Sequence, residues 1–159
     1  TGKFLDTWKA LEKIYNEGRV RAIGISNFLP VHLDKLLREA EIVPALNQME
    51  FHPYLIQQPL FDQCRTNGIH YQAWSPIMLG KVFEIPLFKE IGKKYGKNEA
   101  QVVLRWDLQR DVLTIPKSVK KERIISNANI FDFELSEGEM SLIDSLDCNT
   151  RLGYDPMLV

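Results

Sequence analysis

The sequence is poor in cysteine, has no long apolar run and carries almost no net charge. Its two cysteines, Cys64 and Cys148, stand far apart and in no CxxC or metal-binding spacing, so we expect reduced thiols in a cytoplasmic protein rather than a disulfide scaffold. No stretch approaches the roughly 20 apolar residues that a membrane-spanning helix needs. A formal net charge of −1 gives no reason to expect nucleic acid or a membrane surface as a partner.

Apart from these shortages, the composition is that of an ordinary globular protein, with 45% hydrophobic and 26% charged residues. The length of 159 residues suits one core, and we expect a single domain over residues 1–159. The chain lacks an initiator methionine, and its opening, "TGKFLDTW", runs directly into a helical pattern. We therefore expect no signal peptide and a sequence that begins partway through a longer fold.

Apolar strands and amphipathic helices alternate along the chain. Strands are predicted over residues 20–28, 44–53, 69–77 and 112–116. Helical spacing of apolar residues predicts helices through 5–15, 33–40, 60–64, 87–95, 99–108, 124–131 and 137–146, with a loop between 76 and 86 and an irregular tail. Strand–helix alternation without hairpin signals predicts an α/β fold with four parallel strands joined by right-handed crossovers.

Polar side chains follow the end of each predicted strand. They are Ser26 and Asn27 at the end of the first strand, Gln48, Glu50 and His52 along and after the second, Trp74 and Ser75 at the end of the third, and Lys117 and Ser118 after the fourth. For any single strand, a role in capping or turning the chain is the better explanation. Because the carboxyl ends of parallel strands meet at one edge, the four together predict a shared ligand site.

The stretch "LTIPKSVKKERIISNANIF" (113–131) places several cations between a strand and a helix. A helix N-terminus offers free N–H groups and partial positive charge, and Lys117, Ser118 and Arg123 add charge-assisted hydrogen bonds. A solvated basic face is the usual explanation of a charge run. The position at a strand–helix hinge favours a phosphate site instead.

The other strand ends complete the outline of one ligand. The segment "SPIMLGK", which begins at Ser75, predicts a second anion site. The amides of Asn27 and Gln48 suit a planar carboxamide, and Trp74 offers a ring for stacking. A carboxamide, an aromatic ring, a pyrophosphate and a terminal phosphate together describe a nicotinamide dinucleotide phosphate, NADP(H).

The same segments resemble the aldo-keto reductase family. They are "RAIGISNF" (21–28), "NQMEFHP" (47–53), "AWSP" (73–76) and "IPKSVKKERIISN" (115–127), and they stand in the family's order and spacing. The tail "RLGYDP" (151–156) is similar to that of the bacterial and protist branch that includes diketogluconate-type reductases. The resemblance covers essentially the whole chain.

The resemblance implies the C-terminal half of a (β/α)8 barrel, since a complete barrel needs about 250 residues. This half comprises the family's fourth helix, strands five to eight and the tail. The implied cofactor-binding residues are Ser26, Asn27 and Gln48 at the carboxamide, Trp74 on the nicotinamide ring, Ser75, Ile77 and Gly80 at the pyrophosphate, Lys117, Ser118 and Arg123 at the 2′-phosphate, and Asn127 at the adenine; Val119, beside Ser118, is also expected to contact the cofactor. Two residues depart from the commonest family pattern, Trp74 for tyrosine and Ser126 for an acidic residue.

The family's catalytic aspartate, tyrosine, lysine and histidine belong to the first four strands, and no residues here correspond to them. We therefore assign no catalytic residue and no metal ligand, and we expect His52 to be structural. The implied activity of a complete enzyme is NADPH-dependent reduction of a small aldehyde or ketone, with this chain as the cofactor-binding half and inactive in isolation.

Two alternatives remain open at this stage: a non-catalytic NADP(H)-binding half-barrel that assembles with another half, and a fragment without function. An open half-barrel exposes the strand edges at "VRAIGIS" and "VLTIP". It also leaves Ile23, Ile25 and Leu46 without cover, so we expect partner strands to cover them.

Overall fold

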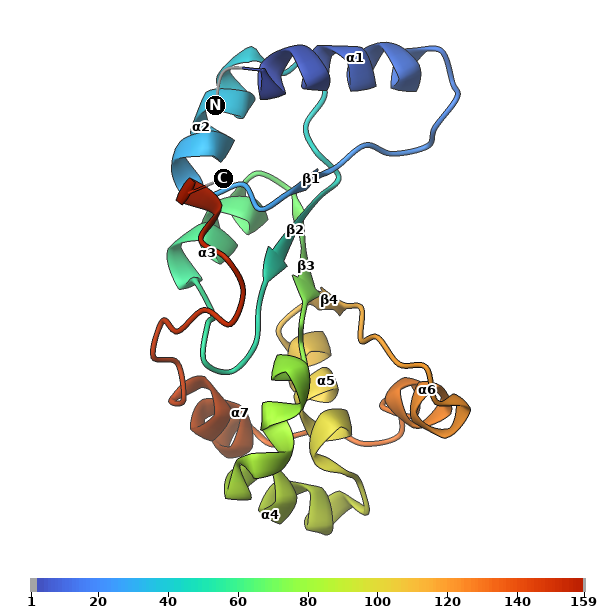
Figure 1. Cartoon of the computed structure of the whole chain (residues 1–159), viewed down its shortest axis with the longest axis vertical. Helices are drawn as coiled ribbons and strands as arrows, with labels where there is room; N and C mark the ends of the chain where they lie inside the picture. Colours follow the sequence, from blue (N-terminus) through green and yellow to red (C-terminus); the bar gives the residue numbers. More distant parts are fainter. Residues whose placement is uncertain (1–2, 159) are drawn as a thin grey trace.

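The computed structural model describes residues 3–158 and contains a four-stranded sheet in the order β1-β2-β3-β4. The strands are β1 (Ile25–Ser26), β2 (Leu46–Glu50), β3 (His70–Trp74) and β4 (Val112–Thr114), and every neighbouring pair is parallel (Figure 1). The predicted parallel α/β sheet is therefore confirmed. The strands are shorter than predicted, most of all β1. The chain before it still accepts a hydrogen bond, from Ala45 N to Ile23 O at 2.8 Å, but forms no continuous ladder.

Helices connect the strands as the apolar spacing predicts. They are α1 (Phe4–Asn16), α2 (Pro30–Glu39), α3 (Gln58–Thr66), α4 (Pro86–Tyr95), α5 (Glu99–Gln109), α6 (Lys121–Ala128) and α7 (Glu137–Asp144). The first three lie toward one end of the molecule and the last four toward the other (Figure 1). The Asn98 side chain accepts a hydrogen bond from Gln101 N and the Ser136 side chain accepts one from Glu139 N, so these residues cap the N-termini of α5 and α7.

Two segments differ from the sequence prediction. The loop expected between residues 76 and 86 contains the 3-10 helix η1 (Met78–Glu84), which is kinked where Leu79 and Gly80 have positive φ. The irregular tail ends in a second short helix, η2 (Pro156–Leu158). Both are short helices without a periodic apolar face, which is why spacing alone did not indicate them.

One face of the sheet is buried under helices and forms the core. Alternate strand residues supply it: Asn47, Met49, Tyr71, Ala73 and Val112 are all buried. Phe51 stacks on Trp106 of α5, with ring centroids 5.2 Å apart. Ile23 and Ile25 are also buried, at 7% and 8% exposure, so the expectation that they lack cover was wrong. The side chains of Ile23 and Ile25 belong to the core on the helix-covered face of the sheet.

The other face of the sheet is largely open. It carries Gln48, Gln72 and Leu113, and Gln48 Nε2 donates to Gln72 Oε1 at 2.6 Å across the β2–β3 pair. Leu113 is 42% exposed. Within the described residues, β1 pairs only with β2 and β4 only with β3. Both outer edges of the sheet are therefore unpaired. None of the helices in residues 3–158 combines the length and apolarity that crossing a membrane requires.

Asp107 of α5 is a buried carboxyl group without a hydrogen-bond partner among residues 3–158. The Thr114 hydroxyl of β4 is likewise unpartnered. Burial raises the pKa of Asp107 well above its ordinary value of 3.8, and this outweighs the opposing influence of Thr114 and Arg110. The folded chain therefore holds a proton on Asp107 that the unfolded chain releases near its ordinary pKa.

Replacing this acid by its neutral isostere tests that conclusion. Because the pKa is raised on folding, wild-type stability falls as pH rises above 3.8 toward the folded value. Asp107→Asn removes this loss, so its melting temperature should exceed that of wild type by roughly a few degrees near neutral pH. The difference should shrink as the pH falls below 3.8, because there the wild-type carboxyl becomes protonated in the unfolded chain as well.

Thermal unfolding followed across this pH range is the measurement. Asp111→Asn is the matched control, since Asp111 is exposed and its positive φ suits asparagine. An Asp107→Asn variant less stable than wild type at every pH would contradict a proton held on Asp107.

Candidate functional site

The C-terminal tail, residues 147–158, lies across the carboxyl ends of the strands. It runs from α7 back past β2 and ends near α2 (Figure 1). Thr150 N donates to Tyr54 O at 2.9 Å and fixes the first part of the tail. The tail therefore adds residues to the edge at which the sequence predicts a ligand site.

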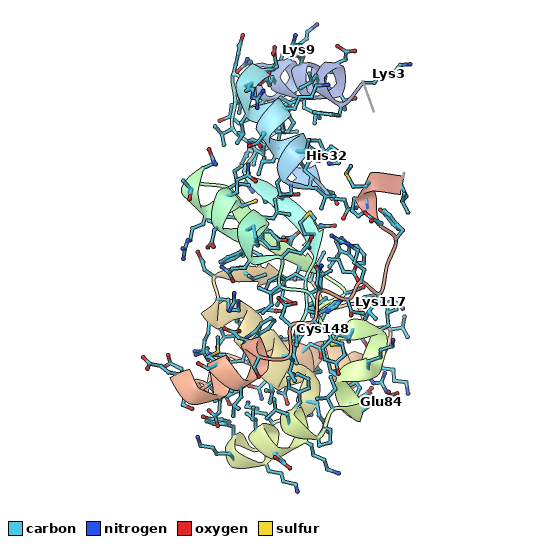
Figure 2. All side chains as sticks on the ribbon, turned by 90° about the vertical axis from the view of Figure 1, so that its left-hand side faces the viewer. Lys3, Lys9, His32, Glu84, Lys117 and Cys148 are labelled. Carbon is cyan, nitrogen blue, oxygen red and sulfur yellow. The ribbon has the colours of Figure 1, made fainter. Side chains whose placement is uncertain are left out.

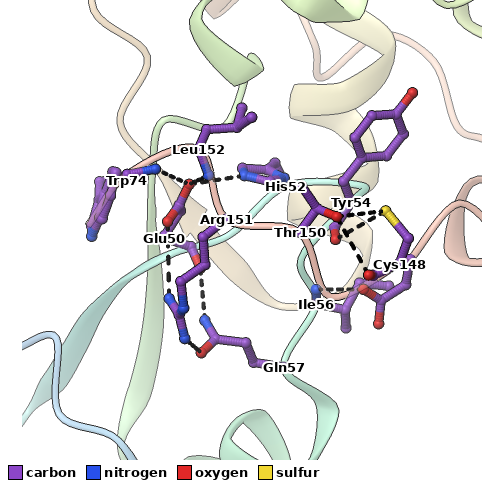
Figure 3. A network of polar contacts seen from close by, with 12 residues as sticks. Glu50, His52, Tyr54, Ile56, Gln57, Trp74, Cys148, Thr150, Arg151 and Leu152 are labelled. Carbon is purple, nitrogen blue, oxygen red and sulfur yellow. Dashed lines mark hydrogen bonds and ion pairs between the residues drawn. The ribbon is translucent and has the colours of Figure 1, made fainter. Parts of the chain in front are cut away.

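Glu50, at the end of β2, is the anchor of the tail. Its side chain is fully buried, and Oε1 accepts the backbone N–H groups of Leu152 at 2.6 Å and Gly153 at 3.0 Å (Figure 3). Arg151 Nη1 lies 3.9 Å from Glu50 Oε2. Arg151 Nη2 also donates to Gln57 Oε1 at 2.6 Å, and Gln57 Nε2 donates to Glu50 O at 2.9 Å. The carboxylate thus joins β2 to the tail.

His52 completes this network from the same strand end. Its Nε2 donates to Glu50 Oε1 at 3.2 Å, while Nδ1 has no partner in the described part of the chain. Burial lowers the pKa of His52 against the opposing effect of Glu50, so the imidazole is neutral near pH 7 and the proton lies on Nε2. His52 supports Glu50, in keeping with the expectation of a structural role.

Asn27, Trp74 and Tyr154 form a second polar group beside the tail. Trp74 Nε1 donates to Asn27 Oδ1 at 2.9 Å, and Asn27 Nδ2 donates to the Tyr154 hydroxyl at 3.0 Å. The rings of Trp74 and Tyr154 stack with centroids 6.4 Å apart. The two predicted residues are therefore in contact, and the tail supplies a third. Sequence reasoning missed Tyr154, for which "RLGYDP" gave only a family resemblance.

A cavity of about 290 Å³ lies beside this group. Ser26, Asn27 and Tyr154 line it together with Phe4, Phe28, His32 and Pro156. Ser26 Oγ donates to Gln48 O at 3.0 Å, which joins the end of β1 to the middle of β2. This first cavity combines hydroxyl and amide groups with aromatic walls.

A second cavity, of about 200 Å³, lies between η1, α5 and α6. It is lined by five of the predicted cofactor residues, Ile77, Lys117, Ser118, Arg123 and Asn127, and by Phe83, Asn98, Ala100 and Ser126. Neither Lys117 nor Arg123 forms an ion pair with any carboxylate of residues 3–158. Two uncompensated cations, a hydroxyl and an amide form a donor set that fits a phosphate group.

Helix α6 carries part of this donor set, and α5 holds it in place. Asn98 Nδ2 donates to Ser126 Oγ at 3.0 Å, and Gln101 Nε2 donates to Ser126 O at 3.1 Å and to Asn129 O at 2.9 Å. Among residues 3–158, no side chain caps the N-terminus of α6, although the Ser118 hydroxyl accepts a hydrogen bond from Lys120 N at 3.1 Å. The start of α6 therefore presents its positive end next to the cations.

The structure does not gather all the predicted residues into these cavities. Gln48, Trp74, Ser75, Gly80 and Val119 line neither one, although Trp74 and Gln48 contact residues of the first. Ser75, which directly follows β3, and Gly80, at the kink within η1, both have positive φ, and Val119 is 81% exposed. His32 of the first cavity and Lys117 of the second lie at different heights along the molecule (Figure 2). In residues 3–158, no three metal-ligating side chains come together.

Known proteins are similar to this chain in sequence and fold. Residues 2–148 match the Aldo/keto reductase family. Glyoxal reductase of Bacillus subtilis (strain 168) is 53% identical over 154 residues, which are 97% of this chain and 56% of that protein. The 9,11-endoperoxide prostaglandin H2 reductase of Trypanosoma cruzi (strain CL Brener) is 48% identical over 157 residues, with 97% of this chain and 56% of that protein covered.

Solved structures give the same result. A Gox0644 mutant in complex with NADPH matches with a TM-score of 0.96 and 36% identity, over 99% of this chain and 59% of that one. The Bombyx mori aldo-keto reductase in complex with NADP matches with a TM-score of 0.88 and 32% identity, over 93% of this chain and 52% of that one. The chain spans about half the length of the relatives it matches, which confirms the predicted half of a (β/α)8 barrel. By sequence and by fold, the chain belongs to the aldo/keto reductase family.

Proposed function

We propose that this chain is the NADP(H)-binding half of an oxidoreductase that reduces small aldehydes or ketones to alcohols. The observation that carries the proposal is the second cavity, where Lys117, Ser118 and Arg123 meet without a compensating carboxylate in the described residues. Solved relatives in complex with NADPH and NADP support the choice of ligand.

Each cavity has its own part in the proposal. Lys117, Ser118 and Arg123 hold the 2′-phosphate, whose charge distinguishes NADPH from NADH, while Asn127 lies toward the adenine. Asn27 and Ser26 orient the carboxamide at the first cavity, with Gln48 behind them and Trp74 beside the ring. Ser75, Ile77 and Gly80, in the segment that leads from β3 into η1, would meet the pyrophosphate, and Ile77 also lines the second cavity.

When bound, NADPH supplies a hydride to the carbonyl carbon. The residues of this chain fix the position of the cofactor, and the buried network at Glu50 keeps the strand ends and tail in register. We assign the proton donor to the other half of the barrel. Free Cys64 and Cys148 suit the reducing cytoplasm in which we place the protein.

The open sheet supports a second half-barrel as the partner. The sheet edges are unpaired within residues 3–158, and Ile124, Ile125 and Phe131 on and after α6 are 55%, 61% and 75% exposed. An apolar cavity of about 460 Å³ between β4 and α6 includes Leu113 and Phe131 in its lining. Strands and helices of the other half would cover these groups. The same surfaces favour the second candidate function, a non-catalytic NADP(H)-binding half that assembles with another half.

Charge removal in the second cavity tests the cofactor assignment. Lys117→Met and Arg123→Ala should each weaken NADPH binding about 10- to 100-fold, because a hydrogen bond to a charged group contributes roughly 1.5–3 kcal/mol. Binding of NADH should change little, since it lacks the 2′-phosphate. Isothermal titration calorimetry with NADPH and with NADH measures both affinities.

Lys120→Met is the control, because this exposed lysine lies in the same segment but does not line the cavity. Unchanged NADPH affinity in both Lys117→Met and Arg123→Ala would contradict the phosphate site.

A turnover assay separates the two candidate functions. Residues 1–159 alone should bind NADPH without consuming it, because no catalytic residue is assigned to them. The complete protein should consume NADPH in the presence of a reactive aldehyde. Spectrophotometric measurement of NADPH oxidation is the readout, paired with the intact mass of the natural protein. Binding without turnover by the complete protein would favour the non-catalytic half, and turnover by residues 1–159 alone would contradict the division of roles.

A further inference from the structure

We propose that Tyr154 of the tail is a cofactor-positioning residue whose hydroxyl donates a hydrogen bond to the carboxamide oxygen of NADPH. This inference rests on the proposed function and adds to it a residue outside the strand ends. The evidence is the arrangement of donors and acceptors around Asn27, the cavity that Tyr154 shares with it, and the way the tail is anchored.

The chemistry of Trp74 fixes the direction of each hydrogen bond. An indole N–H is only a donor, so the atom of Asn27 that faces Trp74 Nε1 is the carbonyl oxygen. The amide nitrogen of Asn27 consequently faces Tyr154 and donates to its hydroxyl oxygen at 3.0 Å. The Tyr154 hydroxyl thus acts as an acceptor toward Asn27, and its own hydrogen remains to be donated. No described residue accepts that hydrogen.

Two donors therefore stand side by side at the first cavity. One is the Tyr154 hydroxyl, and the other is the second N–H of Asn27, which makes no hydrogen bond within residues 3–158. The Ser26 hydroxyl is already donated to Gln48 O. A pair of adjacent donors matches one carbonyl oxygen with its two lone pairs. In a nicotinamide dinucleotide, the group next to the ring with this chemistry is the carboxamide.

The tail anchor sets the position of Tyr154. Glu50 Oε1 holds the N–H of Gly153, the residue directly before Tyr154, at 3.0 Å. A Cβ atom at Gly153 would lie 2.5 Å from Trp74 Cη2, so the chain passes against the edge of the indole with no room to spare. The position of Tyr154 is therefore fixed in two ways. Glu50 holds the backbone of the preceding residue, Gly153, and Asn27 donates a hydrogen bond to the Tyr154 hydroxyl. Such support is what a positioning residue requires.

The experiment compares Tyr154→Phe with wild type in the complete protein, using four probes in isothermal titration. NADPH is the complete cofactor, and 2′,5′-ADP contains only its adenosine and 2′-phosphate part, without the nicotinamide. The 3-acetylpyridine analogue of NADP keeps the carbonyl oxygen but lacks the amide nitrogen. The thionicotinamide analogue replaces the oxygen by sulfur, a poor acceptor. Tyr15→Phe, an exposed tyrosine on α1 that lines neither cavity, is the matched control.

Tyr154→Phe should weaken the binding of NADPH and of the acetylpyridine analogue about 3- to 10-fold, because one hydrogen bond contributes about that much to affinity. Affinity for 2′,5′-ADP and for the thionicotinamide analogue should be unchanged, as should all four affinities in Tyr15→Phe. Unchanged NADPH affinity in Tyr154→Phe would overturn the inference. So would an equal loss for 2′,5′-ADP, which would indicate a general structural effect, or an equal loss for the thionicotinamide analogue.

Gly153→Ala provides a second variant that keeps the tyrosine. Because its Cβ would meet Trp74, the tail must shift, and NADPH affinity should fall while 2′,5′-ADP affinity stays constant. Unaltered NADPH affinity here would overturn the positioning role of the tail. Wild-type protein that binds neither NADPH nor 2′,5′-ADP would overturn the proposed function and this inference together. Wild-type protein that binds both, with unchanged NADPH affinity in Tyr154→Phe and Gly153→Ala, would overturn the inference alone.

Discussion

The arrangement of the strand ends depends on one buried carboxylate. Burying a charge without compensation is costly, and Glu50 meets this cost with two backbone N–H groups, the His52 imidazole and the nearby Arg151 guanidinium. Because those N–H groups belong to the tail, satisfying the carboxylate also fixes the path of the tail. The contacts of Trp74 and Tyr154 follow from that path.

The second cavity depends on the helices that cover the buried face of the sheet. Buried residues of β2, β3 and β4 fix the sheet against them, and α5 then holds α6 through Asn98 and Gln101. The cations of the second cavity are exposed, yet the helix that carries Arg123 and Asn127 is firmly tied at its far end. Rigid elements thus support side chains whose charges have no carboxylate partner in the described residues, which is the support that the proposed phosphate site requires.

Local patterns in the sequence predicted the parts of the structure that arise locally. Apolar spacing placed the seven helices and four strands of the described chain, and the hinge position of Lys117, Ser118 and Arg123 predicted their common cavity. The tail could not be predicted in this way, because Glu50 and Leu152 are 102 residues apart and no periodicity links them. The kinked η1 and the cover of Ile23 and Ile25 likewise depend on packing between distant segments.

The contact between Gly153 and Trp74 has a mechanical consequence. With no free space between them, the indole cannot rotate toward the tail unless Gly153 retreats, and Gly153 cannot retreat without stretching its hydrogen bond to Glu50. Ring orientation at the strand end and order in the tail are thus energetically linked, and linkage of this kind acts in both directions. A ligand that binds against the indole therefore also orders the last residues of the chain. Conversely, disorder in the tail lets the indole ring rotate.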